Sequence, residues 1–205
     1  MCSIFGTFGD DSVVKDLHIL NNGRGHLTSS ASIIRQTGDI EVTKTNSELK
    51  DYLLFDSNCF RLYHQQAPTT QESNTIHPSV YKESYLWHNG IVKICCINEL
   101  KNKLNSSSNW DTQLLNQLIV EYGIESLKDV DGSFSCIWWT NNTLRMFRNQ
   151  ISPMFFDLNG TISSVEFNNS VPTTPNTVYE LDLKTHTWNV TTTFNNNELP
   201  FFYFD

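Results

Sequence analysis

The sequence of 205 residues lacks the patterns that mark several large classes of protein. It contains no Gly-rich phosphate loop, so we expect no ATP use within this chain. No apolar run is long enough to span a membrane and no basic-then-apolar segment marks a signal peptide, which predicts a cytoplasmic protein with no membrane partner. Basic residues number 14 against 22 acidic ones, and the net charge of -8 argues against nucleic acid as a partner.

Patterns for metal binding and for disulfides are also missing. The six histidines show no helical or CxxC-like pairing, so we expect neither a metal nor another cofactor. The five cysteines are an odd number and have no CxxC spacing. We expect Cys59, Cys95, Cys96 and Cys136 to be reduced thiols of the core, with Cys95 and Cys96 facing opposite sides of a strand.

What remains is the composition of one folded domain, and we expect it to span residues 1–205. Apolar residues at helical spacing predict two short amphipathic helices, at residues 13–20 and 111–123. Short β-rich runs are predicted at 32–35, 40–43, 52–55, 85–88, 91–95, 134–139, 144–147, 154–156 and 178–183. Stretches rich in Asn, Thr and Ser predict loops at 66–79, 105–109 and 168–176. Periodicity alone therefore indicates an α+β fold.

Cys2 carries the most chemical information because it directly follows the initiator Met1. Methionine aminopeptidases remove Met1 before a small residue, so we expect the mature chain to begin with Cys2 and a free α-amino group. Such an amine titrates at about 7.7–8.0 and a thiol at about 8.5, so the amine can take the thiol proton near neutral pH. On its own, Cys2 also fits a buried thiol at the start of a strand.

Three further segments carry side chains that can bind charged groups or donate hydrogen bonds to an oxygen. Arg61-Leu62 offers a guanidinium that pairs with carboxylates as a planar fork, although most arginines lie exposed at the surface. Asn89-Gly90 offers N–H donors, although this dipeptide between apolar runs is also the strongest short signal for a hairpin turn. Asp111 precedes a periodic apolar stretch, so it fits a helix N-cap that can also bind an ammonium group.

Together and in this order, the segments resemble the class II glutamine amidotransferases, which are N-terminal-nucleophile (Ntn) hydrolases, and most closely the glutaminase domain of asparagine synthetase B. The resemblance begins at Cys2-Ser3-Ile4-Phe5-Gly6, continues through Gly23-Arg24-Gly25 and Asp131-Gly132, and extends to about Trp188. It implies a four-layer αββα sandwich of the Ntn-hydrolase type. It also implies that Cys2 is the nucleophile.

The resemblance implies roles for the other site residues as well. The Asn89 side chain and the Gly90 N–H are expected to form an oxyanion hole. Arg61, beside Leu62, is expected to bind the α-carboxylate of glutamine, and Asp111 to bind its α-ammonium group.

Two departures from the family pattern bear on the substrate. Ile91 follows Gly90 where the family usually has glutamate, so one carboxylate that commonly holds the substrate ammonium is missing. The residues 63–66, usually small or apolar, are Tyr-His-Gln-Gln. A γ-glutamyl amide other than free glutamine therefore stays open as the substrate.

Three functions follow from these considerations. The first is a glutaminase subunit that makes glutamate and ammonia through a Cys2 thioester and passes the ammonia to a separately encoded ATP-dependent synthetase. The second is a hydrolase acting alone on a bulkier γ-glutamyl amide. The third is a non-catalytic module that binds glutamine.

Overall fold

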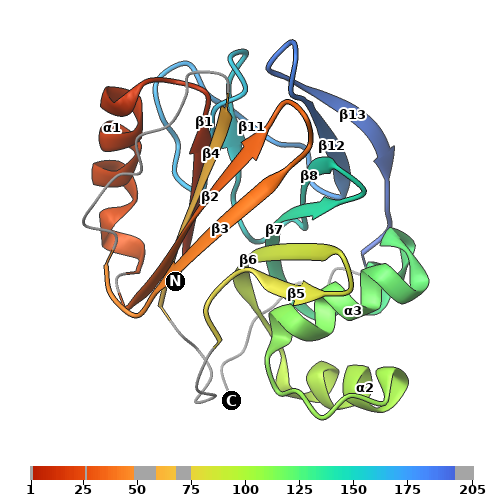
Figure 1. Cartoon of the computed structure of the whole chain (residues 1–205). Coiled ribbons are helices and arrows are strands. Elements are labelled where there is room, and N and C mark those ends of the chain that lie inside the picture. The colour runs from red at the N-terminus through yellow and green to blue at the C-terminus, as the bar shows by residue number, and fades with distance from the viewer. Residues whose placement is uncertain (1, 26, 49–58, 68–74, 197–205) are drawn as a thin grey trace.

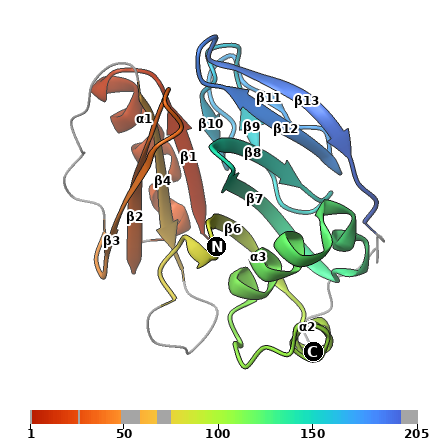
Figure 2. The same cartoon turned by 45° about the vertical axis from the view of Figure 1, so that its right-hand side comes forward.

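The computed structural model describes residues 2–25, 27–48, 59–67 and 75–196. Two antiparallel sheets dominate it (Figures 1 and 2). The expected strand at 52–55 and the processing of Met1 lie outside the described residues.

The sheets use strands that are distant in the sequence. The seven-stranded sheet has the order β11 (Val171–Pro172), β9 (Phe155–Phe156), β10 (Ile162–Ser163), β1 (Ser3–Thr7), β4 (Cys59–Gln66), β2 (Thr28–Arg35) and β3 (Ile40–Thr45). The six-stranded sheet has the order β13 (Thr187–Thr193), β12 (Thr177–Asp182), β8 (Thr143–Arg148), β7 (Gly132–Thr140), β6 (Ser84–Val92) and β5 (Ser79–Tyr81). The helices are α1 (Asp11–Asn21), α2 (Ile94–Leu104) and α3 (Asp111–Tyr122), with 3-10 turns η1 (Asn22–Arg24) and η2 (Ile124–Asp129).

Three apolar clusters define four layers. Ile4 and Leu62 of one sheet share a buried cluster with Trp87 and Ile137 of the other, so these faces pack against each other. On the outer face of the seven-stranded sheet, Phe5 belongs to a cluster with residues of α1. On the outer face of the six-stranded sheet, residues of β6–β8 share a cluster with α2 and α3. The predicted αββα sandwich is confirmed.

The alternation of side chains along β1 explains how one strand serves two layers. Successive side chains of a strand point to opposite faces, so Ile4 enters the cluster between the sheets while Phe5 packs under α1. Helix α1 begins where the Asp10 carboxylate accepts hydrogen bonds from the N–H groups of Ser12 and Val13. The predicted helices at 13–20 and 111–123 correspond to α1 and α3.

The predicted strand at 91–95 is wrong beyond Val92. Residues Ile94–Leu104 form helix α2, which buries Cys96, Ile97 and Leu100 at helical spacing against the six-stranded sheet. Cys95 is exposed on this helix, so it is not a core thiol and it does not lie on a strand. No disulfide joins Cys2, Cys59, Cys95, Cys96 and Cys136, all of which lie in the described part of the chain.

The structure excludes two alternative interpretations of single segments. Asn89-Gly90 is not a hairpin turn, because both residues lie inside the long strand β6, opposite Ser135 and Phe134 of β7. Asp111 is not the N-cap of α3: that position is held by Trp110, and Asp111 is the first helical residue.

Candidate active site

Cys2 lies at the start of β1, where the two sheets face each other. It is buried, with 7% of its surface exposed, and its Sγ is 3.7 Å from the backbone carbonyl oxygen of Ala67. Strand alternation gives Cys2 the same side as Ile4, whose side chain belongs to the cluster between the sheets. The thiol is therefore enclosed by protein on the side where the sheets meet.

Two charged side chains act on this thiol. Burial raises the pKa of the Cys2 thiol, the charge of Asp111 raises it further, and the charge of Arg24 acts in the opposite direction. Arg24 follows helix α1 and donates from Nε to the Cys2 carbonyl oxygen at 3.2 Å. A buried thiol of this kind needs a base or a cation beside it to become a nucleophile.

Asn89 is joined to β1 through one hydroxyl group. Its Nδ2 donates to the Ser164 hydroxyl at 3.3 Å, and the same hydroxyl accepts the Ile4 N–H at 3.0 Å. The Ser164 N–H in turn donates to the Ile4 carbonyl oxygen at 2.8 Å. The Asn89 amide, which comes from the six-stranded sheet, is therefore linked to the backbone of Ile4, two residues after Cys2.

Gly90 lies where the backbones of β6 and β7 leave no space for a side chain. A Cβ at this position would overlap the Ser133 carbonyl oxygen and come within 2.7 Å of the His88 Nε2. The residue is therefore restricted to glycine by close contact.

Asp111 is buried at the start of α3 and its two carboxylate oxygens face different groups. Oδ1 accepts the Thr112 N–H at 2.7 Å and the Thr112 hydroxyl at 3.3 Å. Oδ2 accepts the Val92 N–H at 3.3 Å and lies 3.7 Å from His88 Nδ1. Burial acts to raise the pKa of Asp111, but the net shift is downward because His88 and the backbone N–H groups stabilise the carboxylate.

Three buried histidines contact one another near the start of α3. The rings of His64 and His77 stack with centroids 3.9 Å apart, and His64 Nε2 is 3.2 Å from the His88 carbonyl oxygen. His77 Nε2 and His88 Nδ1 both approach the Thr112 hydroxyl, at 3.0 and 3.2 Å. Burial lowers the pKa of His64 to about 3 and that of His77 well below its usual value.

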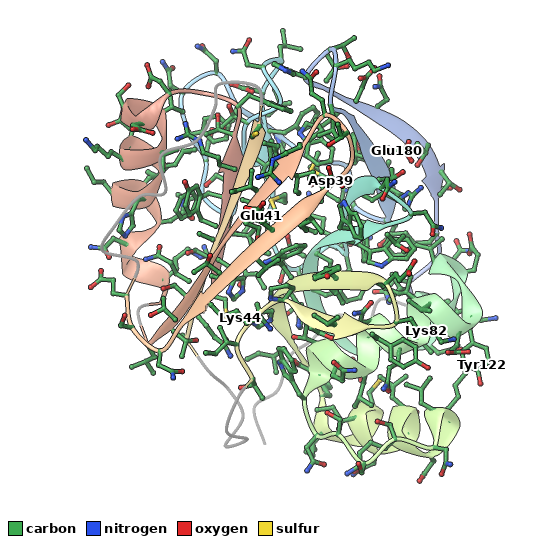
Figure 3. The ribbon with its side chains drawn as sticks, in the orientation of Figure 1. Asp39, Glu41, Lys44, Lys82, Tyr122 and Glu180 are labelled. Carbon is green, nitrogen blue, oxygen red and sulfur yellow. The ribbon has the colours of Figure 1, made fainter. Side chains whose placement is uncertain are left out.

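The segment that carries His77 is held from the seven-stranded sheet. Lys44 of β3, which is labelled in Figure 3, donates to the carbonyl oxygens of Ile76 and Pro78, at 2.8 and 2.7 Å. His77 Nδ1 also lies 3.1 Å from Gln66 Oε1, one residue before Ala67. The histidine cluster thus connects the surroundings of Cys2 with the start of α3.

The structure does not bring Arg61 to Cys2. The register pairs Arg61 with Thr7, at the opposite end of β1 from Ser3, which pairs with Gln65. Arg61 also alternates with Leu62, which is buried between the sheets, so its side chain faces α1. There its Nη1 lies 2.5 Å from Asp11 Oδ1, and its Nη2 donates to the Gly9 carbonyl oxygen. This geometry does not support contact between Arg61 or Leu62 and a substrate at Cys2.

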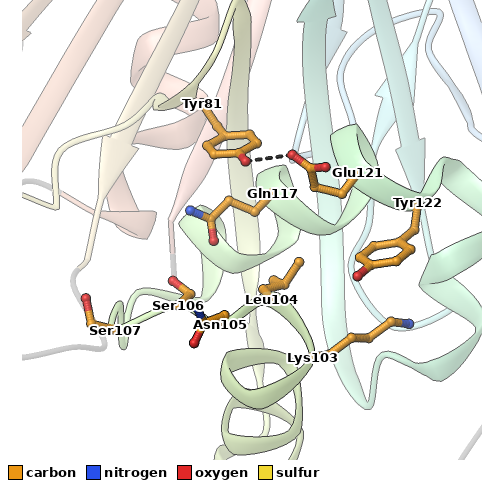
Figure 4. A pocket seen from close by; sticks show the side chains of 9 residues that line it. All are labelled: Tyr81, Lys103, Leu104, Asn105, Ser106, Ser107, Gln117, Glu121 and Tyr122. Atoms are coloured by element: carbon orange, nitrogen blue, oxygen red, sulfur yellow. Dashed lines mark hydrogen bonds between the residues drawn. The ribbon is translucent and has the colours of Figure 1, made fainter.

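A separate cavity lies between the end of α2 and α3 (Figure 4). Its volume is about 570 Å³, and Tyr81, Gln117, Glu121 and Tyr122 are among its lining residues. The Tyr81 hydroxyl donates to Glu121 Oε1 at 2.6 Å. None of the predicted site residues lines this cavity.

Within the described part of the chain, no group of three or more His, Cys, Asp or Glu side chains is arranged to hold a metal ion. The helices of this part are all too short or too polar to cross a bilayer.

The arrangement of the two sheets, with a cysteine at the start of the inner strand β1, is the fold of the Ntn hydrolases. One solved structure with this fold is glutamine phosphoribosylpyrophosphate amidotransferase from B. subtilis complexed with ADP and GMP, with a TM-score of 0.64 and 15% identity over 94% of this chain and 51% of that one. Another is described as the allosteric regulatory enzyme of purine biosynthesis, with a TM-score of 0.65 and 16% identity over 88% of this chain and 47% of that one. The chain thus spans about half the length of these proteins. No protein-family model and no curated protein sequence matches it.

Several residues of the site were not singled out from the sequence. The bridge that Ser164 forms between Asn89 and Ile4 depends on the two sheets coming together. The sequence did not predict the contact between His64 and His77. These residues are 13 positions apart, in a strand and a loop, and their rings stack only in the folded chain. No periodic pattern in the sequence predicts such contacts.

Proposed function

We propose that this chain is a glutaminase of the class II glutamine amidotransferase type, which hydrolyses glutamine to glutamate and ammonia. The observation that carries the proposal is the position of Cys2 at the start of β1, with Asn89 linked to the same strand through Ser164. An N-terminal thiol and a nearby amide donor are the two groups that attack on a carboxamide requires.

The proposed reaction proceeds through a thioester. After removal of Met1, the Cys2 amine takes the thiol proton and the thiolate attacks the carboxamide carbon of the substrate. The oxyanion accepts hydrogen bonds from Asn89 Nδ2 and the Gly90 N–H, and ammonia leaves with the proton held by the amine. Water then attacks the thioester, which releases glutamate and restores the thiol.

Asp111 is the proposed acceptor for the α-ammonium group of the substrate. It is buried, its charge acts on the Cys2 thiol, and its Oδ2 accepts one hydrogen bond, from the Val92 N–H, which leaves a lone pair for an ammonium group. We assign no substrate contact to Arg61, because its guanidinium is bound to Asp11 and Gly9 on the far face of the sheet.

The ammonia needs an acceptor, and we propose a separately encoded ATP-dependent synthetase as the partner. The chain contains no Gly-rich phosphate loop of its own. The amidated product of the partner, whether asparagine-like or larger, is left to experiment.

A second candidate is a hydrolase acting alone on a bulkier γ-glutamyl amide. Two observations favour it: Ile91 replaces a carboxylate beside Gly90, and Arg61 lies away from Cys2. Both features weaken binding of the α-ammonium and α-carboxylate groups of a free amino acid.

Ammonia release from glutamine, measured beside amine release from γ-glutamyl peptides, tests these proposals. Cys2→Ala serves as the control for the nucleophile. Faster turnover of glutamine supports the glutaminase, and faster turnover of the peptides supports the second candidate. Binding of glutamine without turnover of either substrate, with candidate synthetases present, contradicts both and leaves a non-catalytic glutamine-binding module.

A further inference from the structure

His88 is placed to interact with the carboxylate that we assign to the substrate. It lies on β6, it is 2% exposed, and its ring faces the start of α3. Its Nε2 is 3.3 Å from the Ser133 carbonyl oxygen. Its Nδ1 is 3.2 Å from the Thr112 hydroxyl and 3.7 Å from Asp111 Oδ2.

The partners of His88 determine which nitrogen carries a proton. A carbonyl oxygen only accepts hydrogen bonds, so the contact with Ser133 requires a proton on Nε2. When His88 is neutral, Nδ1 therefore carries no proton and can act only as a hydrogen-bond acceptor, while the Thr112 hydroxyl hydrogen is donated to Asp111 Oδ1. When His88 takes up a second proton, it is Nδ1 that carries it, and the new positive charge lies beside Asp111 Oδ2.

The pKa values of the other titratable groups around His88 are shifted away from neutral pH. His64 and His77 face it from β4 and from residues 75–78, and burial lowers the pKa of His64 to about 3 and that of His77 well below its ordinary value. Cys136 faces it from β7, and burial raises its thiol pKa well above the ordinary value. Asp111 stays ionised, because its pKa is lowered.

Two further titratable groups lie near the histidine cluster, and both are present whichever ligand is bound. Lys44 acts electrostatically on His77 and is fixed by the carbonyl oxygens of Ile76 and Pro78. The α-amino group of Cys2 in the processed chain titrates near neutral pH in model compounds. A comparison between ligands that differ in one amine therefore isolates the interaction at Asp111.

We infer that His88 is a positioning residue that competes with the α-ammonium group of the substrate for the single negative charge of Asp111. A buried carboxylate is compensated by one adjacent cation, and a second cation there lacks a counter-charge. Protonation of His88 at Nδ1 therefore disfavours an ammonium group at Asp111, and binding of that group expels the Nδ1 proton to solvent. This inference rests on the proposed function in one respect, the assignment of Asp111 to the α-ammonium group.

The inference is tested by binding rather than by turnover. In the Cys2→Ala protein, calorimetry measures the affinity for glutamine and for glutaramate, which is glutamine without its α-amino group, between pH 5 and pH 8. We expect glutamine binding to weaken toward acid pH, by up to about tenfold per pH unit for one linked proton, and glutaramate binding to stay level. We also expect glutamine to release protons on binding, seen as a dependence of the measured heat on the buffer.

The variant and its control separate charge from packing. His88→Asn removes the competing charge, so the acid weakening of glutamine binding should disappear. His64→Gln removes an equally buried imidazole that does not face Asp111, so the acid weakening should remain. The inference is overturned if both ligands weaken in parallel, if His88→Asn keeps the acid weakening, or if glutamine does not bind at any pH.

The proposed function can fail separately. Wild-type protein that turns over no amide, while the Cys2→Ala protein binds glutamine with the expected acid weakening, contradicts the glutaminase and supports the role of His88.

Discussion

The Asn89 side chain donates to the Ser164 hydroxyl at 3.3 Å, and through that hydroxyl it is tied to the Ile4 N–H of strand β1. Asn89 belongs to the six-stranded sheet and Ile4 to the seven-stranded sheet, so this contact fixes how the sheets meet beside Cys2. The geometry of the candidate site thus depends on the packing of the two sheets.

Asn89→Ala should reduce turnover because one of the two proposed donors to the oxyanion is lost. We expect kcat for glutamine to fall about 10²–10³-fold with KM nearly unchanged. Asn116→Ala is the matched control, since Asn116 is a fully buried amide that bonds Ser79 and Ser84 away from Cys2. Equal losses of kcat in the two variants would contradict the role of Asn89.

Gly90→Ala should destabilise the protein because the new Cβ would overlap the Ser133 carbonyl oxygen of the neighbouring strand. Overpacking of this kind costs about 1–3 kcal/mol, which urea unfolding measures. At Gly23 nothing lies within 4 Å of an added Cβ, so Gly23→Ala should change the free energy of unfolding little. Unchanged stability in Gly90→Ala would show that the strands are not packed as described.

Arg61→Gln should lower stability and leave substrate binding unchanged. The guanidinium is buried between Asp11 and the Gly9 carbonyl oxygen, and loss of hydrogen bonds to a charged group costs about 1.5–3 kcal/mol. Asp11→Asn removes the same ion pair from the other side and serves as the control. A large rise in KM for glutamine in Arg61→Gln alone would restore Arg61 as the carboxylate-binding residue.

Acid pH should destabilise the protein through its buried histidines. The pKa of His64 is about 3 in the folded state against 6.5 in the unfolded chain, and that of His77 is also lowered, so the unfolded chain binds more protons. Stability is therefore full above pH 6.5 and falls as the pH drops toward 3, by up to about 1.4 kcal/mol per pH unit for each histidine.

Urea unfolding at a series of pH values from 8 to 5 checks this prediction. His64→Gln and His77→Gln should each reduce the slope of stability against pH in this range. Equal slopes in the variants and the unmodified protein would mean that other groups cause the acid sensitivity.

The sequence predicted the layers better than the details of the site. Helices α1 and α3 were predicted because apolar residues recur at helical spacing. Helix α2 was missed because the apolar run at 91–95 resembles a strand, while its true buried stripe of Cys96, Ile97 and Leu100 continues beyond that run.

The placement of Arg61 could not be predicted for a different reason. Its side chain points away from Cys2 because of strand alternation and the register with Thr7, and register is set by the packed sheet rather than by a short motif. The same holds for the histidine cluster, whose three members come from separate segments.

The proposed function requires Cys2 to act as an N-terminal nucleophile. Intact mass combined with labelling by the glutamine analogue 6-diazo-5-oxo-norleucine, on the wild type and on Cys2→Ala, tests it most directly. We expect a mass without Met1 and one adduct that is lost in Cys2→Ala. A retained Met1 with no adduct, or an adduct that persists in Cys2→Ala, would contradict it.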